Sequence, residues 1–119
     1  MDDKIRAGLA AAGIDVDEAL ERFMGSEAML NRFLKKFPAD QGFAALAAAL
    51  KAGDHEGAVN AAHTLKGLCG NLSIKPLFTG FDRQVSLMRA GDWDAAAAMM
   101  PQLTEDYNRA VEAIQAMEG

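Results

Sequence analysis

The feature that most limits how this chain can fold is a helix-ending signal that occurs twice. Residues 50–54 read LKAGD and residues 88–92 read MRAGD. Glycine can adopt the left-handed conformation that closes a helix, and an aspartate directly after it can cap the next helix. Lys51 and Arg89 fall in the last turns, where positive charge suits the helix dipole. Corners this short favour neighbouring helices that run antiparallel.

The segments on either side of these corners also favour helix. No alternating apolar run bounded by turn residues predicts a strand. Half of the residues are hydrophobic, with alanine abundant and valine and isoleucine few, and unbranched side chains lose little freedom in a helix. We expect helices over about 15–24, 27–52, 54–72, 75–90 and 92–117, with Pro38 breaking or kinking the second and Pro101 lying inside the last. This pattern predicts an all-α protein, an antiparallel four-helix bundle with a short additional N-terminal helix, in one domain over residues 1–119.

The bulk properties exclude several classes of protein. Cys69 is the only cysteine, so no intrachain disulfide can form and a reducing compartment is expected. The acidic start at Met1 has no apolar segment after it, which is unlike a signal peptide, so we expect a cytoplasmic protein. The sequence leaves open whether the chain is free-standing or part of a longer hybrid kinase, and the start at Met1 with a complete set of bundle helices favours the first. The net charge is −5 without a basic block, which argues against nucleic acid and against anionic membranes as partners.

One helix, residues 58–72, does not look like ordinary packing. On a wheel of about 100° per residue, one apolar arc is formed by Ala58, Ala61, Leu65, Leu68, Cys69 and Leu72. His63 lies opposite this arc, with Lys66, Gly67 and Gly70 on its face and Asn71 at the flank. A glycine inside a helix costs roughly 1 kcal/mol relative to alanine. Two glycines on an exposed face therefore indicate a surface that another molecule approaches closely.

The residue types on this face suit phosphoryl chemistry. A solvent-exposed imidazole is largely neutral near neutral pH and can act as a nucleophile. Lys66, one turn away, can balance the charge of a phosphoryl group. A metal site is disfavoured, because His63 and Cys69 lie about 240° apart around the helix and cannot share one ligand sphere.

These residues carry a resemblance to a known family. The stretch from His63 to Gly67 (HTLKG), followed by Gly70-Asn71-Leu72, resembles the phosphorylation-site helix of histidine-containing phosphotransfer (HPt) domains. Residues 13–23 (GIDVDEALERF) resemble the entry segment of that family. The resemblance covers about residues 13–115, almost the whole chain.

The resemblance implies a phosphocarrier without kinase activity of its own. His63 would carry a phosphoryl group between receiver-domain aspartates, with response regulators and a hybrid sensor histidine kinase as partners. Lys66 would neutralise charge, and Gly67 and Gly70 would give clearance. From its place at the flank of the same face, Asn71 would either orient the site or touch the partner. The receiver would supply magnesium, so no cofactor of the chain's own is expected, and we expect a monomer.

The entry helix leaves one question open. Val16, Leu20 and Phe23 lie on one stripe of this helix, where they serve either as core or as part of the docking surface.

Two positions depart from the family pattern. Ser73 stands where the family usually has glycine. Gln84 is the nearest candidate for a hydrogen bond that orients His63, although the ungapped register puts Val85 at that place.

Two other functions are alternatives to phosphotransfer. A histidine-kinase dimerisation domain is disfavoured, since Thr64 replaces the expected acidic residue and no ATP-binding segment is present. A helical adaptor that never carries phosphohistidine remains the alternative.

Overall fold

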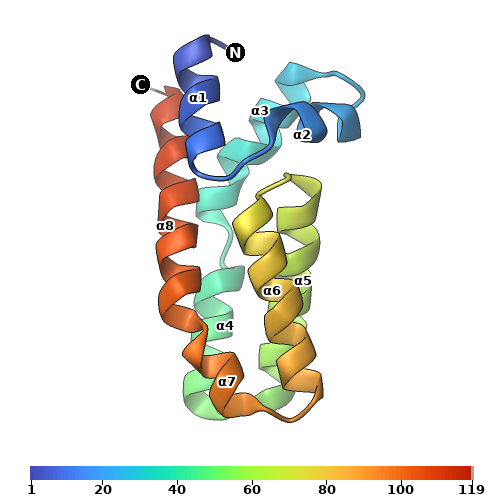
Figure 1. Ribbon diagram of the computed structural model, residues 1–119, viewed down its shortest axis with the longest axis vertical. Coiled ribbons are helices and arrows are strands. Elements are labelled where there is room, and N and C mark those ends of the chain that lie inside the picture. The colour runs from blue at the N-terminus through green and yellow to red at the C-terminus, as the bar shows by residue number, and fades with distance from the viewer. Residues whose placement is uncertain (119) are drawn as a thin grey trace.

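The chain folds into helices joined by short turns, as a computed structural model of residues 1–118 shows (Figure 1). The α-helices are α1 (Asp3–Ala11), α2 (Val16–Arg22), α3 (Glu27–Lys36), α4 (Gly42–Ala52), α5 (His55–Asn71), α6 (Lys75–Arg89), α7 (Trp93–Ala98) and α8 (Met100–Gln115). Two 3₁₀ turns, η1 (Phe37–Ala39) and η2 (Ala116–Glu118), complete the described residues. The predicted all-α fold is confirmed.

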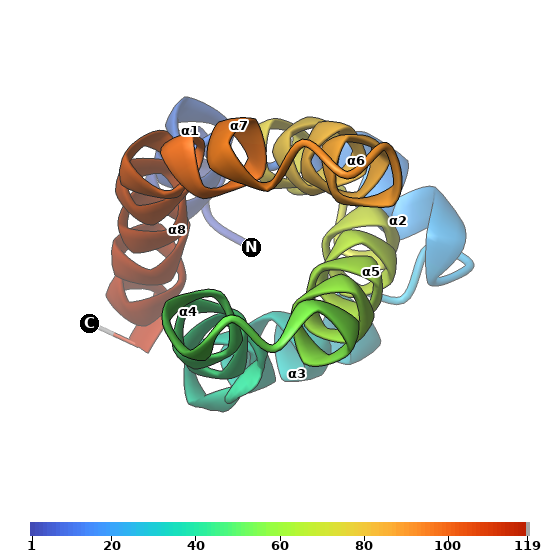
Figure 2. The same ribbon diagram turned by 90° about the horizontal axis from the view of Figure 1, so that it is seen from below.

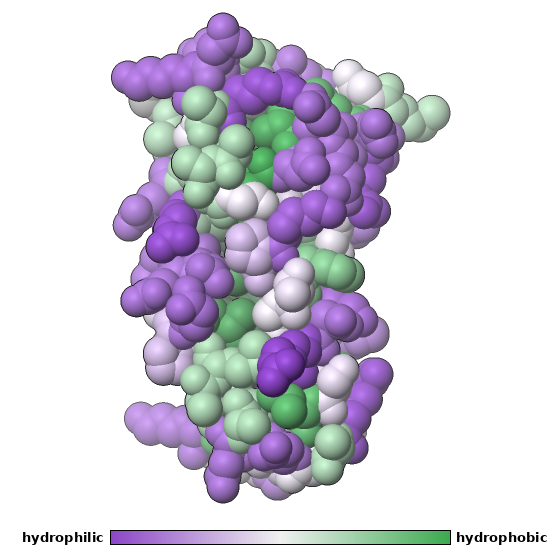
Figure 3. Space-filling model, in the orientation of Figure 1, coloured by the Kyte–Doolittle hydropathy of each residue, from purple (hydrophilic) through white to green (hydrophobic). Residues whose placement is uncertain are grey.

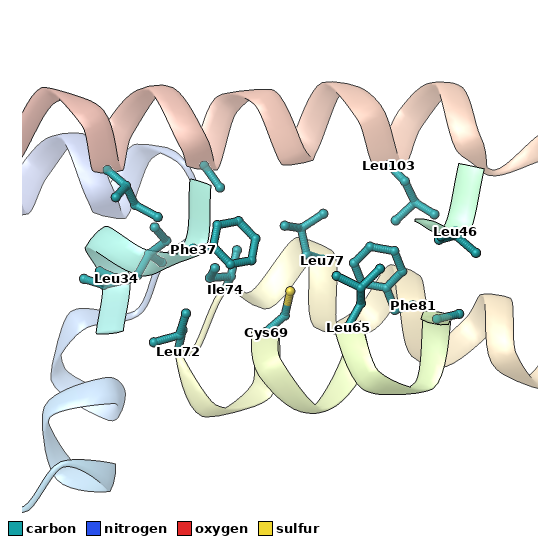
Figure 4. Close-up of a cluster of buried hydrophobic side chains, with 14 of the residues drawn as sticks. Leu34, Phe37, Leu46, Leu65, Cys69, Leu72, Ile74, Leu77, Phe81 and Leu103 are labelled. Carbon is teal, nitrogen blue, oxygen red and sulfur yellow. The ribbon is translucent and has the colours of Figure 1, made fainter. Parts of the chain in front are cut away.

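Four helices surround the main core. Viewed end-on, α4, α5, α6 and α8 form the corners of the bundle, and α2 lies outside it on the side of α5 and α6 (Figure 2). Buried side chains of these helices and of the α3–η1 segment fill the centre (Figure 4). Cys69 points into this core, and burial raises the pKa of its thiol to about 12. The thiol therefore behaves as a small apolar group.

The two corners predicted from the Gly-Asp pairs are present. Gly53 and Gly91 take left-handed φ values of 71° and 79°. Asp54 then accepts a hydrogen bond from the backbone N–H of Gly57 at 3.0 Å, and Asp92 accepts one from Ala95 at 3.2 Å. At both corners, glycine closes the preceding helix and aspartate caps the following one, as the sequence predicts.

The structure differs from the sequence prediction in its first and last helices, and it confirms the interruption expected at Pro38. Residues 3–11 form an unpredicted helix, α1, which buries Leu9 completely and packs against α8. At Pro38 the chain makes a 3₁₀ turn and α4 begins only at Gly42. The expected helix over 92–117 divides at Met99, and Pro101 takes the first turn of α8, where its missing N–H removes no helical bond.

A short backbone pairing fixes α2 to the end of α5. The N–H of Asp15 donates to the carbonyl of Ser73 at 2.9 Å, and the N–H of Lys75 donates to the carbonyl of Gly13 at 3.0 Å. Ile14 and Ile74 form an isolated antiparallel bridge between these bonds, and both side chains are buried. The segment that leads into α2 is therefore held on the turn between α5 and α6.

The bundle is elongated, measuring 43 × 26 × 20 Å. The face drawn in Figure 3 is mostly hydrophilic, with apolar residues in separate patches. Over the described residues, no helix combines the length and the apolar character needed to cross a membrane.

Candidate functional site

His63 lies in the middle of α5 with its side chain exposed. The opposite face of the helix buries Ala58, Ala62, Leu65 and Cys69 against the neighbouring helices. The helix wheel therefore predicted the orientation of His63 correctly, because the apolar arc alone decides which face of α5 turns inward.

A shallow hollow of about 330 Å³ lies beside His63. It is lined by Arg22, His63, Lys66, Gly67, Gly70, Asn71 and Phe78. The structure thus gathers all five residues that the sequence placed on this face, and adds Arg22 from α2 and Phe78 from α6. Sequence reasoning missed these two because they come from other helices. Gly70 held a signal for Phe78, since a small residue often marks where a neighbouring helix places a large one.

The two glycines have different surroundings. A Cβ atom added at Gly67 would have no atom within 4 Å, so this position is open to an approaching molecule. A Cβ atom added at Gly70 would lie 3.1 Å and 3.2 Å from two ring carbons of Phe78. Gly70 therefore makes room first for a side chain of the chain itself, which was not foreseen.

Both cations that line the hollow are paired with carboxylates. The ammonium of Lys66 lies 2.8 Å from Oδ1 of Asp82 on α6, and Nη2 of Arg22 lies 3.0 Å from Oε1 of Glu18. Glu18 also pairs with Lys75 at the start of α6. The hydrogen bond with Lys75, followed by that with Arg22, holds the pKa of the Glu18 carboxyl below its ordinary value. Lys66 is therefore near His63 but not without a partner.

The expectation that Gln84 orients His63 is corrected by the structure. The Gln84 side chain is fully buried, and its amide donates to the carbonyl of Ala96 at 3.0 Å and to the sulfur of Met100 at 3.4 Å. The physical reason is helix phase. Asp82 faces α5, and a residue two positions later lies about 200° round the helix, which turns Gln84 toward α7 and α8.

The stripe on α2 divides between core and surface. Val16 is buried, whereas Leu20 and Phe23 are half-buried. The ring of Phe23 packs against that of Phe33, with centroids 5.2 Å apart. Around this pair the chain exposes apolar side chains, with Met24 95% and Met29 46% exposed. We name this surface, formed by Phe23, Met24, Met29 and Phe33, the α2–α3 apolar patch.

Comparison with known proteins gives one match. A family model described as the Hpt domain matches residues 28–113, from α3 to α8, including all of α5. The helices α1 and α2 lie outside the matched range. No curated protein and no solved structure matches the chain.

Proposed function

The chain belongs to the Hpt domain family, and on that premise we propose that His63 carries a phosphoryl group between receiver-domain aspartates of a phosphorelay. The family acts in histidine phosphotransfer of two-component signalling, as phosphocarriers and not as kinases. The observation that carries the proposal is an exposed histidine beside a hollow that also contains Lys66 and the open face of Gly67.

The transfer step needs few groups from this chain. A lone pair on one ring nitrogen of neutral His63 attacks the phosphorus of the receiver's aspartyl phosphate. The nitrogen–phosphorus bond forms as the phosphorus–oxygen bond breaks, and that electron pair leaves with the aspartate carboxylate. The proton on the other ring nitrogen stays in place, so this step requires no proton acceptor. Reversal of the same step delivers the group to another receiver.

The residues around His63 have distinct tasks in this proposal. Lys66 offsets the charge of the phosphoryl group, Gly67 lets the receiver approach the helix, and Asn71 contacts the receiver at the rim. The receiver supplies the magnesium ion and most of the catalytic groups, while this chain provides no cofactor of its own.

The surface beyond the hollow suits a protein partner. Phe78, which is 37% exposed, lines the hollow from α6, and the α2–α3 apolar patch begins directly after Arg22, which lines the hollow from α2. Half-exposed phenylalanine and methionine side chains are typical anchors in protein interfaces. We propose that a receiver domain covers this surface, so that its aspartyl phosphate reaches His63. A hybrid sensor histidine kinase would present such a receiver upstream, and a response regulator would present one downstream.

A labelling experiment tests the proposal. The wild-type protein, a His63→Gln variant and a His55→Gln variant are each incubated with a radiolabelled phospho-receiver domain. His55 is a matched control, because it is the other histidine, it lies at the start of the same helix, and it stacks on Trp93 away from the hollow. Label that is acid-labile and base-stable should appear on the wild type and on His55→Gln, and be absent from His63→Gln. ATP alone should label none of them.

Two results would contradict the proposal. Label on His63→Gln would place the phosphoryl group on another residue. Failure of several cognate receivers to label the wild type, together with equal partner binding by wild type and His63→Ala, would favour the helical adaptor.

A further inference from the structure

The cation next to His63 is held by a residue of the neighbouring helix. The Lys66 ammonium and the Asp82 carboxylate are 2.8 Å apart, with the two side chains 31% and 54% exposed. Asp82 is the one acidic residue of α6. The pairing is therefore specific to this pair of helices and is not one of several equivalent contacts along them.

Two contacts give the register between α5 and α6. Lys66 meets Asp82, and one turn further along α5 Gly70 meets Phe78. Because the helices are antiparallel, one turn in the other direction brings residue 62 opposite residue 86. Asp82 thus faces α5 about one helical turn from the level of His63, where it pairs with Lys66 of the hollow's lining.

This placement puts a fixed negative charge close to the phosphoryl site. A phosphoryl group on His63 adds a charge of about −1.5 to −2. The ammonium of Lys66 can then pair with two anionic groups, the phosphoryl oxygens and the Asp82 carboxylate. The carboxylate also repels the phosphoryl group, since like charges at this range disfavour one another. Both effects weaken the hold of the site on the phosphoryl group.

From this geometry we infer that Asp82 is a positioning residue for phosphotransfer. It holds Lys66 in the unphosphorylated protein and competes with the phosphoryl group for it afterwards, which keeps the group on His63 easy to pass on. This inference rests on the proposed function. It concerns the lifetime of the phosphohistidine, and not which residue is phosphorylated.

The test uses phosphoramidate as the phosphoryl donor, so that no partner protein is needed. Its phosphorus–nitrogen bond breaks as the bond to the His63 ring nitrogen forms, and ammonia leaves after taking up a proton from water. The half-life of the phosphohistidine is then followed in buffer for wild type and for Asp82→Asn. Exposed ion pairs contribute modestly, so we expect the half-life in Asp82→Asn to be about 2- to 5-fold longer.

Matched variants separate this role from a structural one. Asp82→Glu keeps the charge and should restore a half-life close to that of wild type. Glu112→Gln removes one negative charge from an exposed position on α8, across the bundle from α5 (Figure 2), and should change nothing. In a Lys66→Met background, the effect of Asp82→Asn should fall to less than half, because only the direct repulsion remains.

Each failure has its own meaning. If wild type is labelled but Asp82→Asn decays at the same rate, the inference is wrong while the proposed function stands. An undiminished effect in the Lys66→Met background would also overturn it, because Asp82 would then act without Lys66. If phosphoramidate never labels His63 in the wild type, the proposed function and this inference fall together.

Discussion

The two ends of α5 are joined to their neighbours by corners that are built differently. At the start of α5, Gly53 takes the left-handed conformation and Asp54 caps the helix. At the other end, next to the hollow, Ser73 takes the left-handed conformation with φ 53°. Ser73 is 1% exposed, and its hydroxyl has no hydrogen-bond partner among the described residues. The left-handed conformation is therefore taken by a glycine at the corner far from the site and by a serine, which adopts it at a cost, at the corner beside the site.

The difference teaches where each corner gets its stability. The corner at Gly53 follows local rules and needs little from the rest of the fold. The corner at Ser73 is held by buried neighbours and by backbone bonds to the segment before α2, including the bond from Asp15 to the Ser73 carbonyl. A strained residue persists only where its surroundings over-determine it. The surroundings here are those that hold α2 and α5 together at the site.

The largest loss of stability should come from truncating a buried side chain that packs around the Ser73 corner. Ile74 is 0% exposed and forms the bridge with Ile14, so Ile74→Ala should lower the free energy of unfolding by about 2–5 kcal/mol. Lys51→Ala, on the exposed face at the other corner, should stay within about 0.5 kcal/mol of wild type. Urea denaturation measures both. A loss below about 1 kcal/mol for Ile74→Ala would mean that the site corner is held locally after all.

A reciprocal exchange between the corners should give opposite signs. Ser73→Gly relieves the left-handed strain and removes a buried unpaired hydroxyl, at the cost of a more flexible unfolded chain. We expect a net gain in unfolding free energy of about 1–2 kcal/mol. Gly53→Ser forces a side chain into the left-handed region and should lose about 1 kcal/mol. Thermal or urea unfolding compares the two, and changes of the same sign would contradict the comparison.

The same contrast separates what the sequence predicts from what it does not. The Gly-Asp corners and the outward direction of His63 follow from local rules, so they were predicted correctly. Ser73 was noticed only as a departure, because its conformation depends on the distant segment around Asp15. Gln84 was misplaced, since the phase of α6 against α5 is a tertiary property. Arg22 reaches the hollow only through the packing of α2, which no local pattern encodes.

A smaller loss should follow when the local cap at the distant corner is removed. Asp54→Ala leaves the Gly57 N–H without its acceptor and should cost about 1 kcal/mol in unfolding free energy. Asp54→Asn keeps a side-chain acceptor and should cost much less. Phosphoryl uptake at His63 should be unchanged in both, because the site end of α5 is held independently. A parallel loss of uptake and stability in Asp54→Ala would show that the two ends are coupled.

The smallest effect concerns acid and the ion pairs that hold α2 at the site end. The pKa of Glu18 is lower in the folded protein than in the unfolded chain, first because of Lys75 and then because of Arg22. Such a group stabilises the fold above its unfolded pKa, and the contribution is lost as the pH falls through the folded pKa. The free energy of unfolding of the wild type should therefore fall more steeply than that of Glu18→Gln as the pH drops from the unfolded to the folded pKa of Glu18, and the two curves should converge at more acidic pH. Urea denaturation of both proteins across the acid range measures this difference. If the two curves stayed parallel over the whole range, the ion pairs of Glu18 would contribute nothing to the site end, and α2 would be held there by the buried bridge and its backbone bonds alone.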